Sequence, residues 1–213
     1  MSAGGRYSEE PANARAFTER LDGYITRSAR AYDLVVPLMP FWRRWLSAAL
    51  PYLRGPRVLE VSFGTGWLLT RYAGRFEAHG VDLNHKMLQI AIRNLQRRGL
   101  DAQLQLANVE APPYPDETFD TVLNTMAFTG YPDASKAMGE LGRVLKADGR
   151  LVMIDLNYPH DDRAGKALVA VGRRFGDLIR DMQPIFHAAG LEASDQEIGG
   201  FGSIHLYLAT KLV

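Results

Sequence analysis

The first feature of this chain whose residue types suit ligand binding is a glycine turn that follows an apolar run. Residues 58–61 are typical of a short buried strand, and Gly64 and Gly66 follow before a predicted helix at residues 67–73. Glycine lets the backbone approach a ligand closely, and the N–H groups at a helix start favour a negative group such as a carboxylate. Many α/β proteins carry such a turn for packing alone, so a purely structural role for the two glycines stays open here.

Asp82 ends the second predicted strand, which covers residues 77–82. In a doubly wound sheet this strand end faces the same crevice as the glycine turn, and a carboxylate there can accept hydrogen bonds from both hydroxyls of a ribose. The alternative is a solvated acid at a strand end. The pairing of Asp82 with the glycine turn favours the ribose interpretation.

Three later blocks extend this pattern. Asn108 and Val109 follow the third predicted strand, where a polar side chain and a backbone amide can read the edge of an adenine ring. The fourth strand, residues 119–125, brings Asn124 to the same crevice, and residues 140–151 form the fifth block. The order and spacing of five blocks is a far stronger signal than any one block.

The elements that position these residues alternate between strands and helices. Strands are predicted at residues 58–61, 77–82, 102–106, 119–125, 150–156, 191–198 and 203–212, and helices at residues 67–73, 86–98, 133–146 (closed by Gly149) and 164–189 (broken near Pro184). This alternation predicts an α/β fold with a doubly wound, mostly parallel sheet. The glycine-rich connection between the last two strands cannot carry a crossover helix, so these strands form a hairpin with an antiparallel edge strand.

Length, charge and composition narrow the possible functions. The chain has 213 residues, and its 25 basic and 24 acidic side chains leave a net charge of +1, which gives no footprint for nucleic acid as a partner. It has no cysteine, so disulfides and thiolate metal sites are excluded. No segment is long and apolar enough to predict a transmembrane helix, and the polar start is not a signal peptide, so we expect a cytoplasmic protein.

Taken together, the blocks resemble class I S-adenosylmethionine (SAM)-dependent methyltransferases. Residues 60–66 resemble the acid-x-Gly-x-Gly-x-Gly motif of that family, and residues 119–120 and 141–151 resemble its later blocks. The resemblance covers residues 57–156 well and the terminal hairpin loosely. It implies a Rossmann-like sheet of seven strands with an antiparallel last strand, and SAM as the cofactor. The domains expected are a helical extension or lid at residues 1–53 and a SAM-binding methyltransferase domain at residues 54–213.

The resemblance also implies roles for individual residues. Gly64 and Gly66 lie against the methionine part of SAM, Glu60 orients its amino group, Leu83 packs on the adenine and Asn124 lies near the reactive methyl. The expected cofactor-binding set is Tyr32, Glu60, Ser62, Gly64, Gly66, Asp82, Leu83, Asn108, Val109 and Asn124.

Two positions depart from the family pattern. Ser62 stands where the family usually has its first glycine, and Asn108 where it often has aspartate, although an amide oxygen can still accept a hydrogen bond from the adenine amino group. Ser62 keeps open a second function, a catalytically silent SAM-binding protein of the same fold. A nicotinamide-dependent dehydrogenase is disfavoured because its fingerprint needs a third glycine where this chain has Leu69.

Within the family, the chain is most similar to the ubiquinone/menaquinone-biosynthesis C-methyltransferase type. Residues 31–33 resemble the Tyr-Asp pair on a helix that closes over SAM, which places Tyr32 at the cofactor, although a core tyrosine is an equal alternative. The quinone-specific blocks differ, since Arg43 replaces an expected histidine. The expected partner is a small-molecule acceptor, with a hydrophobic quinol, phenol or lipid amine as options; the oligomeric state is left open.

The loop after the fifth strand supplies the candidates for acceptor chemistry. Loops at the carboxyl ends of strands line the active crevice of such folds, so Asp155, Tyr158 or His160 is expected to deprotonate or orient the acceptor. The five histidines include no pair with the helical spacing of metal ligands, so no metal site is predicted.

Overall fold

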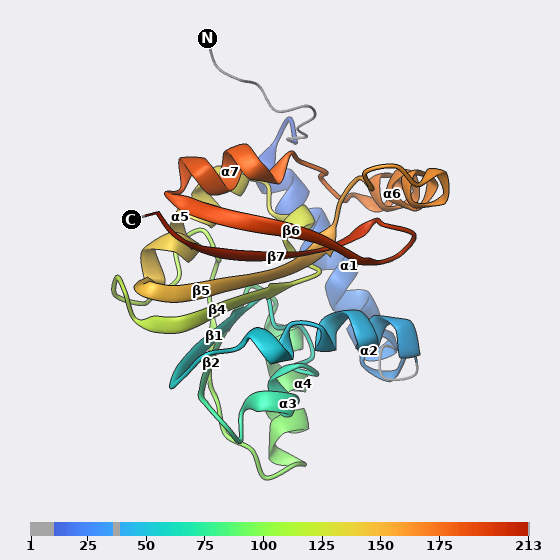
Figure 1. Cartoon of the computed structure of the whole chain (residues 1–213). Coiled ribbons are helices and arrows are strands. Elements are labelled where there is room, and N and C mark those ends of the chain that lie inside the picture. Colours follow the sequence, from blue (N-terminus) through green and yellow to red (C-terminus); the bar gives the residue numbers. More distant parts are fainter. Residues whose placement is uncertain (1–10, 36–38, 213) are drawn as a thin grey trace.

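A single seven-stranded sheet organises the computed structural model, which describes residues 11–35 and 39–212, without the side chains of residues 28–35 and Phe175 (Figure 1). The strands are β1 (Arg57–Val61), β2 (Glu77–Asp82), β3 (Gln103–Leu106), β4 (Phe119–Thr125), β5 (Leu145–Leu156), β6 (Leu191–Gly199) and β7 (Ile204–Lys211). Their order is β3-β2-β1-β4-β5-β7-β6. Strands β1 to β5 are parallel, and β7 runs antiparallel to both of its neighbours.

The predicted hairpin is confirmed, but the antiparallel strand is not at the edge. Strand β7 inserts between β5 and β6, so β6 is the edge strand. The turn at residues 200–203 is too short for a crossover, and β7 pairs with β5 through residues such as Met153 and Tyr207. Tyr207 is almost fully buried, which is what an interior strand requires.

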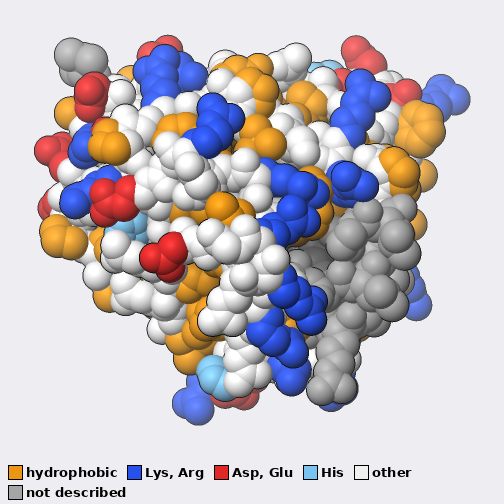
Figure 2. All heavy atoms as spheres, turned by 90° about the horizontal axis from the view of Figure 1, so that it is seen from below, with side chains coloured by type: hydrophobic (Ala, Val, Ile, Leu, Met, Phe, Trp, Pro, Cys, Tyr) orange, Lys and Arg blue, Asp and Glu red, His pale blue; other side chains and the backbone are white. Residues whose placement is uncertain are grey.

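Helices cover both faces of the sheet. They are α1 (Ala14–Val35), α2 (Pro40–Ser47), α3 (Leu69–Tyr72), α4 (His85–Gln96), α5 (Ala134–Val144), α6 (Arg163–Phe175) and α7 (Met182–Ala188), with 3-10 turns η2 (Leu50–Tyr52) and η3 (Phe128–Gly130). Side chains of α5 and α7 pack on one face of the sheet and those of α3 and α4 on the other, while α1 packs against α4. The face of the molecule seen from below, where α2, α3 and α4 lie, is rich in Lys and Arg side chains (Figures 1 and 2).

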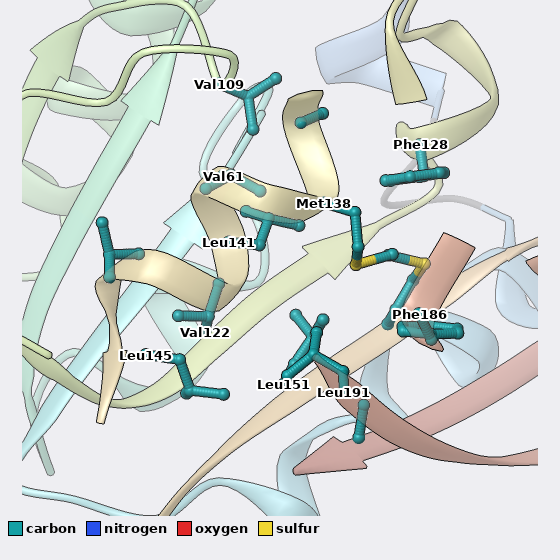
Figure 3. Close-up of a cluster of buried hydrophobic side chains, with 14 of the residues drawn as sticks. Val61, Val109, Val122, Phe128, Met138, Leu141, Leu145, Leu151, Phe186 and Leu191 are labelled. Atoms are coloured by element: carbon teal, nitrogen blue, oxygen red, sulfur yellow. The ribbon is translucent and has the colours of Figure 1, made fainter. Parts of the chain in front are cut away.

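Strand alternation divides the core into two layers. Because successive side chains of a strand point to opposite faces, Val122 packs beneath α5 while its neighbour Leu123 packs beneath α3 and α4. Figure 3 shows the first layer, in which Met138 and Leu141 of α5 lie over Val122 and Leu151. These side chains have no exposed surface, and burial of each large one contributes roughly 1.5–3 kcal/mol.

Two helix ends differ from the sequence prediction. Helix α5 begins after its Asp133 cap but ends at Val144 rather than at Lys146, because Leu145 is already part of β5, where it pairs with Phe119. The helix predicted at residues 164–189 with a break near Pro184 is two helices, but the break lies earlier, at residues 176–181. Gly176, with φ of 109°, ends α6, and Pro184 lies in the first turn of α7, where its missing N–H costs no hydrogen bond.

No helix in the described part of the chain is both long and apolar enough to cross a bilayer.

Candidate functional site

A cavity of about 770 Å³ opens where β1, β2 and β4 end. Helices α1 and α2 contribute a further wall through residues such as Ile25, Trp42 and Leu46. The sequence-predicted residues that line the cavity are Glu60, Ser62, Gly64, Asp82, Leu83, Asn108 and Val109. The structure therefore brings the glycine turn and the end of the second strand to one site.

Asp82 ties the glycine turn to the start of α4. Its side chain is 7% exposed, and its two carboxylate oxygens accept backbone hydrogen bonds from Gly64 and Asn84, each at 2.8 Å. Burial raises the pKa of Asp82 to about 6, although both N–H donors act in the opposite direction. Each carboxylate oxygen keeps a second lone pair, so Asp82 can hold the loop and still accept hydrogen bonds from a ligand in the cavity.

Glu60 is a buried carboxyl group with few donors. It is 2% exposed, and its Oε2 accepts a hydrogen bond of 3.0 Å from the hydroxyl of Tyr72. Burial raises the pKa of Glu60 to about 8, and the nearby Asp82 adds to this rise. A cationic group in the cavity would stabilise the ionised form, because an opposite charge at short range offsets the cost of burial.

Positions 64 and 66 of the turn are glycine for different structural reasons. Gly64 has φ of 56°, and a Cβ atom built there meets no atom within 4 Å, so this residue borders open space in the cavity. Gly66 has φ of 69°, and a Cβ atom there would lie 2.8 Å from the Cβ of Ala91 in α4. Gly66 is not among the cavity-lining residues, so its glycine is required by backbone conformation and helix packing.

Ser62 adopts a glycine-like backbone conformation but directs its hydroxyl to a protein partner. Its φ is 52°, its N–H donates to Val81 O at 2.7 Å, and its Oγ lies 2.7 Å from the hydroxyl oxygen of Tyr131. The Tyr131 oxygen also accepts a 2.7 Å hydrogen bond from Asn124 Nδ2. Asn124 is fully buried behind the cavity wall and does not line it, so it supports Tyr131 rather than facing the cavity.

Comparison with known proteins identifies this site. Residues 59–153 match a family model described as a methyltransferase domain. A demethylmenaquinone methyltransferase of Thermus thermophilus is 38% identical over 140 residues, which are 62% of this chain and 63% of that protein. A ubiquinone/menaquinone biosynthesis C-methyltransferase of Teredinibacter turnerae is 29% identical over 169 residues, or 74% of this chain and 68% of that protein. The chain belongs to the class I SAM-dependent methyltransferases.

The structure of this methyltransferase agrees with that assignment. The crystal structure of the YcgJ protein from Bacillus subtilis has a TM-score of 0.63 and 27% sequence identity, and the similarity covers 72% of this chain and 70% of that one. The match to the Thermus protein spans less than two thirds of that protein's length. SAM is the cofactor of the family.

The residues of the methyltransferase fit SAM in shape and in charge. The open space at Gly64 lets a ligand lie against the backbone, where a side chain would otherwise project. SAM carries a sulfonium and an ammonium group against one carboxylate, and the wall offers the carboxyl groups of Glu60 and Asp82. Leu83, which is 45% exposed, and the side chain of Val109 give the cavity an apolar surface suited to a flat ring.

The three residues predicted to act on the acceptor lie elsewhere. Asp155 is 4% exposed, and its carboxylate accepts the backbone N–H groups of Phe128 and Leu156 at 2.5 and 2.7 Å, so it fixes the η3 turn. The Tyr158 hydroxyl accepts a 3.1 Å hydrogen bond from Arg173. None of the three is among the residues that line the described cavity.

His160 is at the surface. Its side chain is 68% exposed and its Nδ1 lies 2.8 Å from Glu197 Oε1. Catalytic roles for Asp155, Tyr158 and His160 stay predictions. Tyr32 falls within α1, but its side chain lies outside the described residues. Within the part of the chain that the structure describes, no three His, Asp or Glu side chains come together as a metal site.

The part of the cavity wall that was expected from the loop after the fifth strand is formed by other residues. Thr129, Tyr131 and Asp177 line the cavity, and the Thr129 hydroxyl donates to Asp177 Oδ1 at 2.9 Å. Burial raises the pKa of Asp177. Tyr131 follows the fourth strand, so its position carried a signal. No sequence signal pointed to Asp177, because the predicted helix at residues 164–189 has its break near Pro184, whereas the observed connection lies at residues 176–181.

Proposed function

We propose that this methyltransferase transfers the methyl group of SAM to a small hydrophobic acceptor of the quinol type. The observation that carries the proposal is the continuous cavity, in which the expected SAM-contacting residues share one space with a separate apolar and hydroxyl-bearing wall. The similarity to the demethylmenaquinone methyltransferase of Thermus thermophilus supports a quinol ring as the acceptor.

The apolar wall suits such an acceptor. Ile25 of α1, Trp42 and Leu46 of α2, and Met126 and Ala127 after β4 all line the cavity. Ligand pockets of this kind are mainly apolar, with a few polar groups that fix orientation. Thr129 and Tyr131 are the polar groups on this side, and we infer that their hydroxyls orient the hydroxyl groups of the quinol.

SAM, when bound, supplies an activated methyl group, so the protein has to align the acceptor and manage one proton. We infer that Asp177 accepts the proton of the quinol hydroxyl as the ring carbon takes up the methyl group. That carbon then loses its own proton and the oxygen regains one, so one proton is released overall. Its carboxylate lines the cavity and burial raises its pKa, which moves it closer to neutral pH, where a general base is most effective. The hydrogen bond from Thr129 fixes the carboxylate in place.

The proposal is tested by methyl transfer from labelled SAM to a chemically reduced, short-chain demethylmenaquinone, with a simple phenol and phosphatidylethanolamine as competing acceptors. Transfer to the quinol ring carbon is expected. Transfer to the phenol or the amine instead would move the assignment to that acceptor. SAM binding without transfer to any of them would favour the catalytically silent alternative.

The role of Asp177 is tested separately with Asp177→Asn. We expect kcat to fall about a hundredfold, within the range of general-base contributions, while SAM affinity measured by calorimetry changes little. Asp133→Asn is the matched control, because Asp133 is an exposed cap of α5 that does not line the cavity. A hundredfold loss of SAM affinity in Asp177→Asn would contradict a role confined to the acceptor.

A further inference from the structure

A second depression, separate in character from the cavity, lies against the outer side of α2. It has a volume of about 410 Å³ and is lined by Pro40, Arg43, Arg44, Ser47, Trp67 and Arg71. The guanidinium carbon of Arg71 lies 4.6 Å from the centroid of the Trp67 ring, and that of Arg43 lies 5.8 Å from it. Two cation–π contacts to one ring therefore hold two arginines at the same place.

Two arginines of this cluster, Arg44 and Arg71, have no acidic partner in the part of the chain that the structure describes. Burial lowers the pKa of Arg71, and the positive charges of Arg98 and Arg43 lower it further. Like charges this close repel one another, so an anion placed between them would be stabilised by all of them.

Helix α2 lies between this cluster and the cavity, and Trp67 lines both. Trp42 and Leu46 point to the cavity, whereas Arg43, Arg44 and Ser47 line the depression. Phe41, at the start of the helix, is 49% exposed. Figure 2 shows that Lys and Arg side chains gather on this face, with hydrophobic side chains between them. A short helix with exposed aromatic and basic residues side by side is typical of segments that bind at a lipid surface.

We propose that Arg44 and Arg71 bind the phosphate of an anionic phospholipid headgroup at a membrane surface. Guanidinium groups match phosphate oxygens through paired N–H donors. Free phosphate would use the same donors, but only a lipid surface also offers an apolar phase for the exposed Phe41 ring. The site would place α2 at the bilayer with the cavity on the other side of the helix. This inference does not depend on which acceptor the methyltransferase uses.

The test is co-sedimentation of the full chain with vesicles of phosphatidylglycerol and phosphatidylcholine, compared with phosphatidylcholine alone. We expect binding only to the anionic vesicles, weakening as salt is raised because counter-ions screen the attraction. Arg44→Gln and Arg71→Gln should each weaken binding about fivefold, the effect of one basic residue near an anionic surface. Lys136→Gln is the matched control, because Lys136 is an exposed basic residue of α5, on the opposite face of the sheet. SAM affinity and melting temperature check that each variant is folded.

Three results would overturn the proposal. One is no binding to anionic vesicles at low salt. Another is an equal loss of binding in Lys136→Gln and Arg71→Gln, which would indicate net charge rather than a site. The third comes from titration with inorganic phosphate: if phosphate binds to the wild type but not to Arg71→Gln while vesicles never bind, the cluster is a site for soluble phosphate. Phe41→Ser adds an independent check, since it should weaken vesicle binding and leave phosphate binding unchanged.

Discussion

The polar side chains at the carboxyl ends of β1 and β2 have a different role from those at the carboxyl ends of β4 and β5. At the ends of β1 and β2, Glu60 and Asp82 line the cavity, as the sequence predicted. At the ends of β4 and β5, Asn124 and Asp155 are buried behind the wall, and each binds a neighbouring loop. A polar residue at a strand end can therefore face a ligand or stabilise the loop that does.

The loops explain the difference. After β1 the chain turns at glycines, which offer no side chain to fill the space, so the carboxyl groups reach open volume. After β4 the chain forms the η3 turn, whose N–H groups need acceptors once they are buried. Asp155 supplies that acceptor, and the cavity wall is left to the turn's own residues, Thr129 and Tyr131.

Replacing Asp82 gives the largest expected effect on binding. Asp82→Ala removes the acceptor for the N–H groups of Gly64 and Asn84 as well as the expected ribose contact. We expect SAM affinity to fall at least about a hundredfold, because hydrogen bonds to charged groups contribute about 1.5–3 kcal/mol each. Calorimetric titration with SAM and S-adenosylhomocysteine measures this, and Asp133→Ala serves as control. Unchanged affinity in Asp82→Ala would show that the carboxylate faces no ligand.

Replacing Asp155 tests the side chains at the carboxyl ends of β4 and β5. Asp155→Ala leaves the buried N–H group of Phe128 and the partly buried N–H group of Leu156 without their acceptor, so we expect a loss of unfolding free energy of about 2–3 kcal/mol. Urea denaturation measures the loss. SAM affinity, measured at a low temperature at which the variant is folded, should stay within threefold of the wild type. If instead the variant is as stable as wild type and only methyl transfer is lost, Asp155 acts on the acceptor as the sequence predicted.

The raised pKa of Glu60 makes SAM binding depend on pH. Burial holds Glu60 protonated below its pKa of about 8, and a bound ammonium group favours the ionised form, so binding releases a proton. We expect affinity to rise about tenfold from pH 6.5 to 7.5, as linkage requires. Titrations at these two pH values should give a flat response in Glu60→Gln. Glu77→Gln, on an exposed residue at the start of β2, should keep the wild-type slope.

Much of the fold was predictable because its signals are local. A small or apolar run that ends on an acid gave β2, and an apolar run after a turn-rich segment gave β4, both with their observed bounds. A position on the cavity wall was predictable where backbone geometry fixes it, as at Gly64 and Asp82. The contact between Thr129 and Asp177 joins residues far apart in the sequence, and no local pattern specifies such a pairing.

Tyr131 is expected to show a smaller effect, on turnover. Tyr131→Phe keeps the ring but removes the hydroxyl that contacts Ser62 and Asn124. We expect kcat/KM to fall about fivefold, comparable to the loss of one neutral hydrogen bond, with SAM affinity within twofold of wild type. Tyr114→Phe is the control, because Tyr114 carries a hydroxyl bonded to Gln105 and does not line the cavity. Equal losses in both variants would remove the specific role of Tyr131.

Replacing His160 should have the smallest effect of these variants, because this residue lies outside the cavity wall. Its ring is exposed and its contact with Glu197 is at the surface, where even a charged pair contributes only about 0–1 kcal/mol. We therefore expect His160→Ala to keep kcat, KM and SAM affinity within twofold, in contrast to Asp177→Asn. A hundredfold loss of kcat in His160→Ala with SAM binding intact would mean that the loop after β5 moves into the cavity when the acceptor binds. The loops after β4 and β5 would then carry the acceptor chemistry. The polar side chains at the ends of β1 and β2 would no longer differ in role from those that follow β4 and β5 once the acceptor is bound.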